Sequence, residues 1–324
     1  MRTLAHRAVT GIAVVAGVLT LTFLLLHAAP GGPARLLLGP RATPEQIAAG
    51  RHALGLDRSL ATQYVDWVGG FIRGRWGTSI VTGRPVRAML SAAWPATVRL
   101  TLLSLVLSYG LGLVIGAIQA ARAGSRLDTS ISVVSVSLVA VPGFWLGLML
   151  VGVFTYLLRL LPAFGAAGFD ADFLGPWGRL LDGARHLALP LATLTLIGLG
   201  AAARFVRGAM LDVLEQPFVV TARAKGLAGA RVLAVHALRN AATPVVTLLG
   251  LSLPALFFGA VFIEGVFAWP GVGRVLVEAV QARDYPVVMA ATAISAILVV
   301  LGNLLADLLA VAVDPRLRTR ESAT

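Results

Sequence analysis

Long apolar runs separated by short polar segments dominate this sequence of 324 residues. A helix that crosses about 30 Å of hydrocarbon needs roughly 20 residues at about 1.5 Å each. The runs lack the strict alternation of barrel strands, and only helices and closed barrels satisfy their backbone inside a bilayer. The pattern therefore predicts an all-α membrane protein with six transmembrane helices. They fall at about 8–29, 96–121, 129–161, 187–203, 244–263 and 286–313.

The first run has some features of a cleaved secretory signal. Arg2 and Arg7 precede it, and His27-Ala28-Ala29 follows it, as in the charged and small-residue flanks of such signals. However, its length of about 20 residues exceeds the roughly 7–15 apolar residues of a signal peptide. We therefore predict a retained first helix.

Composition agrees with a membrane protein. Hydrophobic residues make up 57% of the chain and charged residues 13%, against about 25% charged in soluble domains. This composition excludes a soluble enzyme, a disordered tail and a secreted disulfide scaffold. The chain has no Cys, and its five His are never three or four residues apart, so no thiolate or two-His metal site is expected. No catalytic, cofactor-binding or metal-binding residues are predicted.

The runs divide the chain into four parts. These are a first transmembrane helix (1–29), an extracytoplasmic loop subdomain (30–95), a transmembrane core of five helices (96–313) and a tail (314–324). The loop subdomain contains an amphipathic stretch at Gln63–Ile72 with aromatic residues on one helical face.

Several residues mark helix ends or kinks. Pro95 suits the first turn of the second helix, and Asp128 is a candidate N-cap for the third. Pro142 and Pro254 lie well inside apolar runs, where each should free a backbone carbonyl and kink its helix. Such kinks either serve packing or mark a transport path.

Basic residues predict the orientation in the membrane. With the N-terminus inside, the cytoplasmic segments are 1–7, 122–128, 204–240 and 314–324, and they hold 13 Lys and Arg in 62 residues. The opposite side also holds 13, but in 117 residues. Since basic residues concentrate in cytoplasmic loops, both termini are predicted to be cytoplasmic. The same bias accounts for the net charge of +12, so nucleic-acid binding is not predicted.

The sequence contains no motif for energy conversion or catalysis. It has no G-x-x-x-x-G-K-[ST] loop for ATP phosphates, no H-E-x-x-H and no G-x-S-x-G. Arg99 and Asp307 lie within the spans but near their ends, which is unlike a buried proton relay. A self-sufficient secondary transporter or channel remains an alternative, although it would need inverted repeats and midplane binding groups. An intramembrane enzyme is a third possibility, which the absent catalytic constellations disfavour.

The polar segment 204–240 is predicted to contain a short isolated helix. The fourth helix can run from about Leu187 to Glu215, roughly 43 Å, and so project beyond the bilayer. Pro217 stops it, opens a new helix and biases the preceding residue away from helix. Gly226 then ends the new helix as a C′ glycine. So short a helix needs a partner to pack on, unless it lies on lipid headgroups.

The residues of this segment match a known pattern. Thr221-Ala-Arg-Ala-Lys-Gly226, followed by His236-Ala-Leu-Arg-Asn240 and Pro244, resembles the cytoplasmic "EAA" loop of ABC importer permeases that import dipeptides, oligopeptides and nickel. Val220 stands where many such loops begin with Glu, and Arg75-Trp76 stands where an acidic residue is expected. Further stretches resemble the family in order along the chain: Leu54-Gly-Leu-Asp57, Gln63-Tyr64, Gly77-Thr-Ser79, Thr82-Gly-Arg-Pro85, Glu264 to Trp269-Pro-Gly-Val-Gly273, and Asp314-Pro-Arg316.

The resemblance implies a non-catalytic permease subunit in the plasma membrane of a prokaryote. It would form half of a path for peptides or a similar small solute, with a second homologous permease, two ATP-binding subunits that hold ATP and Mg, and an extracytoplasmic solute-binding protein. The resemblance does not decide whether the transported solute is a dipeptide, an oligopeptide, a nickel chelate or another small solute. The implied ATPase-coupling residues are Glu215, Pro217, Thr221, Ala222, Arg223, Ala224, Lys225 and Gly226. The candidate residues of a transport path or gate are Pro142 and Pro254, selected for their predicted kinks, and Glu264 and Trp269, which lie in a stretch that resembles the family.

Overall fold

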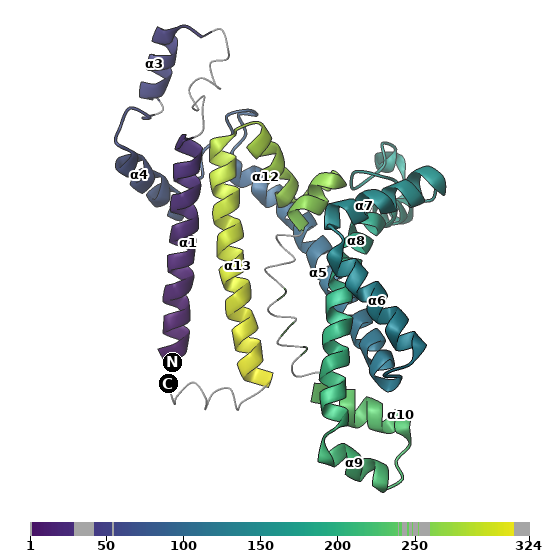
Figure 1. Cartoon of the computed structure of the whole chain (residues 1–324). Coiled ribbons are helices and arrows are strands. Elements are labelled where there is room, and N and C mark those ends of the chain that lie inside the picture. The colour runs from purple at the N-terminus through teal and green to yellow at the C-terminus, as the bar shows by residue number, and fades with distance from the viewer. Residues whose placement is uncertain are drawn as a thin grey trace. The chain divides into compact units, whose positions relative to one another are not determined.

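The structure is a computed structural model whose long regular elements, in the part it describes, are all helices (Figure 1). It describes residues 2–28, 42–53, 55–238, 240–241, 245, 248, 252 and 260–313. In these ranges the only extended pairing is an isolated antiparallel bridge between Thr78 and Pro85. The chain divides into two compact units, Met1–Thr97 with Pro270–Val300 and Val98–Trp269 with Leu301–Thr324. We call them the first and second unit.

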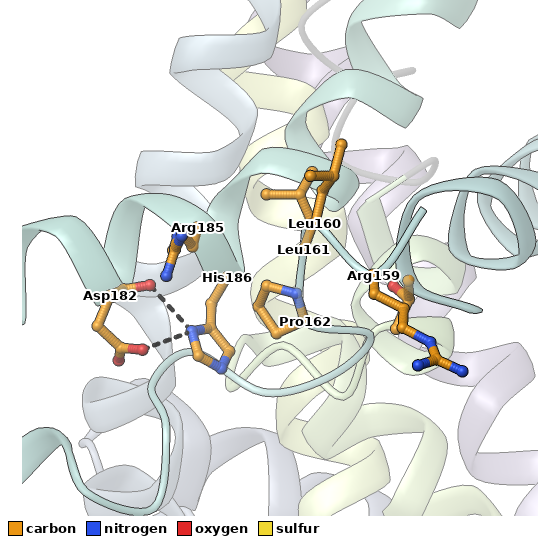
Figure 2. Close-up of a pocket in the computed structure, with 8 residues that line it drawn as sticks. Arg159, Leu160, Leu161, Pro162, Asp182, Arg185 and His186 are labelled. Atoms are coloured by element: carbon orange, nitrogen blue, oxygen red, sulfur yellow. Dashed lines mark hydrogen bonds and ion pairs between the residues drawn. The ribbon is translucent and has the colours of Figure 1, made fainter. Parts of the chain in front are cut away.

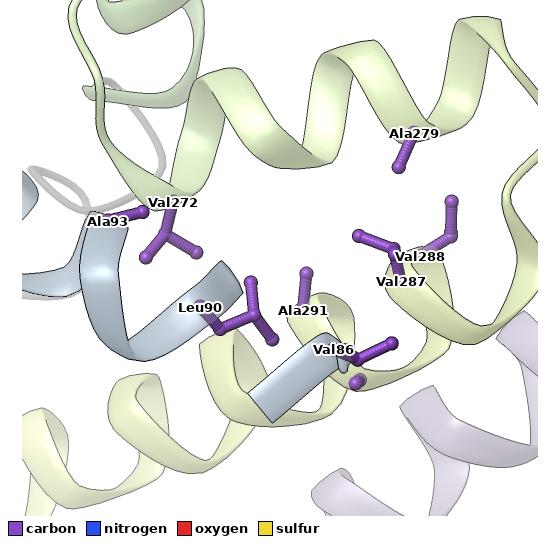
Figure 3. Close-up of a cluster of buried hydrophobic side chains, with 9 residues drawn as sticks. Val86, Leu90, Ala93, Val272, Ala279, Val287, Val288 and Ala291 are labelled. Atoms are coloured by element: carbon purple, nitrogen blue, oxygen red, sulfur yellow. The ribbon is translucent and has the colours of Figure 1, made fainter. Parts of the chain in front are cut away.

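The first unit packs the ends of two long helices around an amphipathic one. Its helices are α1 (Arg2–Ala28), α3 (Pro44–Ala53), α4 (Leu60–Ile72), α12 (Val272–Gln281) and the beginnings of α5 (Val86–Ala121) and α13 (Tyr285–Val313). Figure 3 shows its core, in which Val86 and Leu90 of α5 meet Val272 of α12 and Val287 of α13. Removing such aliphatic side chains from water is the main force that holds the unit together.

Helix α4 confirms the amphipathic stretch predicted at Gln63–Ile72. Ser59 caps its N-terminus by accepting from the Thr62 amide. Its aromatic face lies on the end of α1, where Tyr64 contacts the Phe23 ring at 5.3 Å and hydrogen-bonds the Thr20 hydroxyl at 2.8 Å. The predicted aromatic face is therefore a packing surface between α4 and α1.

The second unit is built around a helix of 39 residues, α8 (Pro176–Leu214). The rest of α5, α6 (Arg126–Ala140) and α7 (Gly143–Val151) accompany it. The remaining short elements are the π-helix η1 (Gly152–Leu157), η2 (Ala171–Phe173), α9 (Pro217–Ala224), α10 (Gly229–Arg231) and the π-helix η3 (Val232–Ala237).

Small residues let α5 and α8 approach closely. A Cβ added to Gly198 would lie 2.5 Å from the Ser108 hydroxyl, and one added to Gly112 would lie 2.6 Å from the Ala202 Cβ. One added to Gly116 would lie 2.7 Å from the Ala203 carbonyl and 2.6 Å from the Val206 Cβ. Residues 108, 112 and 116 thus face residues 198, 202 and 206 at a constant offset along two parallel helices. Small residues at such contacts are typical of helices packed inside membranes.

Among the residues that the structure describes, four helices are long and apolar enough to cross a membrane, and a fifth span is present if a bent pair counts as one. The four comprise part or all of α1, α5, α8 and α13. The third run, predicted as one helix over 129–161, is instead broken between α6 and α7 with a bend of 105°. Val141, which precedes Pro142, takes the extended conformation with φ −77° and ψ 129°, as steric clash with a following proline requires. Most of the fifth run, including Pro254, lies outside the described residues.

Three predicted helix starts are corrected. α5 begins at Val86, so Pro95 lies inside it. α8 begins at Pro176 and not near Leu187, because its first turns carry polar residues that an apolar-run criterion excludes. At α6 the N-cap is Ser125, whose hydroxyl accepts from the Asp128 amide, and not Asp128 itself.

Candidate functional site

The junction between α8 and α9 is fixed by a proline. Gln216 takes an extended conformation, φ −71° and ψ 145°, and Pro217 is the first residue of α9. Proline disfavours helix at the residue before it and suits the first helical position, where its missing N–H is no loss. The break ends α8 at Leu214 and starts an independent helix of eight residues. This confirms the short helix predicted between Pro217 and Gly226.

The other end of α9 is a Schellman motif. Gly226 has φ +76°, its amide donates to the Arg223 carbonyl at 2.9 Å, and the Leu227 amide donates to the Ala222 carbonyl at 3.3 Å. A residue with a Cβ is strained at such a φ, so glycine is the natural choice here. Lys225 is the C-cap.

One face of α9 packs on its own chain. Val219 and Ala222, three residues apart, are buried with Val232 of η3. Val213 and Leu214 at the end of α8 lie against this cluster, as does Leu227. Ala222 is therefore a packing residue that holds α9 against α8 and η3. The helix is positioned by these contacts as well as by its caps.

The rest of the α9 surface is exposed and carries both apolar and basic side chains. Phe218 and Val220 are 44% and 58% exposed. Sequence reasoning did not select these two, although five apolar residues in an eight-residue helix exceed what one packed face can hold. Arg223 and Lys225 form no ion pair within the described ranges. The residues predicted for coupling that are exposed are Glu215, Pro217, Thr221, Arg223, Ala224, Lys225 and Gly226.

A clamp of charged groups joins the first turn of α6 to α8, two turns before the end of α8. Arg207 of α8 donates from Nε and Nη2 to the two carboxylate oxygens of Asp128, at 2.7 and 2.8 Å. The Asp128 carboxylate also accepts from the Gly124 amide at 3.0 Å and lies 3.3 Å from the Gln119 amide nitrogen. The Asp128 side chain is only 4% exposed and that of Arg207 31%. Bidentate charge-assisted pairs of this kind are among the strongest hydrogen bonds in proteins.

The structure brings together two of the residues proposed for a path or gate. Glu264 and Trp269 are both fully buried, and the Trp269 amide donates to the Glu264 carbonyl at 2.9 Å. The turn between them places Ala268 at φ +48°, a left-handed conformation that costs about 1–2 kcal/mol for a residue with a Cβ. The Arg99 guanidinium lies 5.1 Å from the centre of the Trp269 ring, within range of a cation–π interaction.

The bend at Pro142 brings α7 to this segment. A Cβ added to Gly147 would lie 3.0 Å from the Phe267 ring, and one added to Gly143 would lie 3.8 Å from the Ile263 side chain. Pro142 thus acts through the packing of α7 on residues 263–267. Pro254, the fourth residue proposed for the path, lies outside the described residues.

Comparison with known proteins identifies the family. Residues 112–319, which include the clamp, α9 and the Glu264–Trp269 turn, match the model of the binding-protein-dependent transport system inner membrane component. Residues 1–101 match the N-terminal region of such membrane components. The chain belongs to this family. The resemblance read from residues 221–226 and the other motifs is confirmed.

Members of this transport family from several bacteria align with nearly the whole chain. The oligopeptide transport system permease protein AppB of Bacillus subtilis is 38% identical over 96% of this chain and 98% of the relative. The di/tripeptide transport system permease protein DppB of Pseudomonas aeruginosa is 40% identical over 93% and 94%. The dipeptide permease DppB of Escherichia coli is 35% identical over 94% and 95%. The chain is accordingly a multi-pass inner membrane transport component.

Proposed function

We propose that this chain is a permease subunit of an ATP-driven importer and that α9 is the element that receives ATPase movement. The observation that carries the proposal is the two-faced character of α9. Its inner face is packed on α8 and η3, while Phe218 and Val220, which lie on either side of that face, are exposed. Exposed apolar side chains beside basic ones, held at a fixed angle on a short capped helix, suit insertion into a groove of a partner protein.

The second unit offers a route by which movement of α9 reaches the membrane. α8 is 39 residues long, about 58 Å at about 1.5 Å per residue, and it joins α9 directly. The Asp128–Arg207 clamp ties the same end of α8 to the first turn of α6. A displacement of α9 would therefore move α5, α6 and α8 as one body. This movement would change the side of the membrane to which the path that they help to line is open.

Peptides are the proposed cargo. The relatives described above are named as oligopeptide, di/tripeptide and dipeptide permeases, and the alignments leave no large part of the chain unmatched. Family membership disfavours the secondary transporter considered from the sequence. The chain itself would hydrolyse no ATP.

The complete importer would contain a second homologous permease, two ATP-binding subunits that hold ATP and Mg, and an extracytoplasmic solute-binding protein. In this arrangement the chain would cross the membrane six times, with both termini and α9 in the cytoplasm. Loop 30–95 and the segment Glu264–Gly273 would face the binding protein. Glu264, Trp269, Pro142 and Pro254 would belong to the path or its gate.

Site-directed cross-linking tests the coupling role of α9. The chain has no Cys, so single cysteines can be introduced without background. Thr221→Cys, on the exposed face, is expected to cross-link to the ATP-binding partner with a yield that depends on nucleotide. Val219→Cys is the matched control, because it lies two residues away on the buried face and should not cross-link.

A substitution at the helix end gives an independent readout. Gly226→Val should cost about 1–2 kcal/mol locally, because a β-branched residue is strained at positive φ. Membrane insertion depends on the apolar spans, so the complex should be present but its ATPase poorly stimulated by loaded binding protein. Gly229→Val is the control, since Gly229 lies nearby with no atom within 4 Å of an added Cβ. If Thr221→Cys never cross-links and the two valine variants transport alike, α9 lies on lipid and does not couple.

A further inference from the structure

A cavity of about 340 Å³ lies in the second unit, between the end of η1 and the early turns of α8 (Figure 2). Its polar lining comes from Thr155, Arg159, Asp182, Arg185 and His186. The rest of its wall is apolar and consists of Leu160, Leu161 and Pro162. Neither the coupling helix nor the Asp128–Arg207 clamp contributes to it.

The hydroxyl of Thr155 has no hydrogen-bond partner although its oxygen is buried. Some threonines in the α-helices of this chain donate to the carbonyl four residues earlier, as Thr193 does to Leu189 at 2.8 Å and Thr221 to Pro217 at 2.9 Å, whereas the buried hydroxyl of Thr195 in α8 also has no partner. Thr155 lies in a π-helix, and such segments recur at functional sites. A buried hydroxyl without a partner is costly, and Thr155 is one of the residues that line this cavity.

The charges of the cavity do not cancel. Asp182 accepts from the Gly168 amide at 2.8 Å, and its carboxylate lies 3.3 Å from His186 Nδ1. That nitrogen also lies 2.9 Å from the Asp182 carbonyl, and since both neighbours are acceptors, Nδ1 carries the proton. Arg159 and Arg185 are exposed and, within the residues that the structure describes, neither guanidinium has an ion pair or a hydrogen bond. Two free cations thus oppose one carboxylate that already has partners.

The backbone holds one of these cations in a strained conformation. Arg159 has φ +54°, in the left-handed region that costs about 1–2 kcal/mol for a residue with a Cβ. Strain of this kind is common at ligand-binding positions. Figure 2 shows Arg185 beside the Asp182–His186 pair and Arg159 on the other side of Pro162.

We infer that this cavity binds an oxyanion, a carboxylate or a phosphate, through Arg159 or Arg185, with the body of the ligand on the apolar wall. Guanidinium groups suit both anions because their N–H groups match the oxygen geometry. Two sources of such a group are available to a membrane transporter. One is the carboxylate of a peptide solute, which rests on the proposed function, and the other is the phosphate of a lipid headgroup.

Binding to the purified full chain in nanodiscs tests the inference without partner subunits. The probes are alanyl-alanine, its C-terminal amide, and phosphatidylglycerol followed by native mass spectrometry. Arg159→Gln and Arg185→Gln remove one guanidinium each, the matching Lys variants retain the charge, and Thr155→Val removes the hydroxyl. Arg126→Gln is the control, because Arg126 is exposed and lies outside the cavity.

A peptide carboxylate is supported if alanyl-alanine binds saturably to the unchanged chain, if its C-terminal amide binds about tenfold or more weakly, and if one of the two cavity Gln variants binds alanyl-alanine about tenfold or more weakly. Loss of a phosphatidylglycerol adduct in the same variant would support a lipid phosphate, and in either case Lys should restore part of the affinity. The inference fails if no probe binds saturably, or if both cavity Gln variants behave like Arg126→Gln. ATP-driven uptake by the assembled importer is measured separately, so failure of transport and absence of this site are distinguishable.

Discussion

Removing one partner of the Asp128–Arg207 clamp should destabilise the chain by an amount that depends on which partner is lost. Asp128→Asn keeps the size of the side chain and leaves Arg207, whose side chain is 31% exposed and so partly hydrated. We expect a loss of about 1–2 kcal/mol in the free energy of unfolding, in line with a charge-assisted hydrogen bond. Arg207→Gln instead leaves a carboxylate that is only 4% exposed. Such an uncompensated buried charge costs about 3–5 kcal/mol.

The donors that remain around Asp128 reduce the destabilisation expected for Arg207→Gln. The Gly124 amide at 3.0 Å and the Gln119 side chain at 3.3 Å still face the carboxylate, so about 3 kcal/mol is the expected loss for Arg207→Gln. The double variant removes both charges. It should therefore be less destabilised than the sum of the single variants, with a coupling energy of about 1–3 kcal/mol.

Equilibrium unfolding of the reconstituted chain in mixed micelles of increasing denaturing detergent measures these differences. Arg126→Gln is the control. It removes an exposed arginine from the first turn of α6, which also holds Asp128, and should cost under about 0.5 kcal/mol. The reasoning is refuted if Arg207→Gln is no worse than this control. It is also refuted if the double variant equals the sum of the single ones, since additivity would mean that the two groups do not interact.

Two further predictions concern helix packing and topology. Gly116→Ala should destabilise the second unit by about 1–3 kcal/mol in the same unfolding assay, because the added Cβ would lie 2.7 Å from the Ala203 carbonyl. Gly110→Ala is the control and should be neutral or stabilising, because its added Cβ would have no atom within 4 Å. Ala48→Cys should react with an impermeant thiol reagent added outside the cell and Arg320→Cys should not. Labelling of Arg320→Cys from outside would overturn the proposed orientation.

Local sequence signals predicted the ends of α9 correctly. Pro217 and Gly226 act through the conformations available to their own backbones, which are the same in any protein. The predicted limits therefore agree with the structure, in which α9 begins at Pro217 and Lys225 caps it. The apolar runs located α1, α5, α8 and α13 for a similar reason, since a bilayer constrains every spanning segment in the same way, but they did not give the starts of α5 and α8.

Features that depend on distant residues could not be predicted. Asp128 and Arg207 are 79 residues apart, and nothing in either segment marks the other as its partner. The start of α8 was missed because residues such as Arg179, Asp182 and Arg185 interrupt the apolar pattern while remaining compatible with helix. The proline break at Pro142 was expected as a kink, but its angle of 105° is set by the packing of α7.

The constant offset between α5 and α8 limits how force can travel through the second unit. Glycine at 112, 116 and 198 leaves a space that fits the opposing residues only in the present alignment. At these three contacts the Ser108 hydroxyl and the Cβ atoms of Ala202 and Val206 lie closer than an added Cβ would allow, so the two helices are closely interlocked and resist lengthwise sliding. If α9 couples to ATPase subunits as proposed, a push on the end of α8 would therefore tilt or rotate the helix pair. In that case α8 would tilt about its contact with α5 and would not move along its own axis.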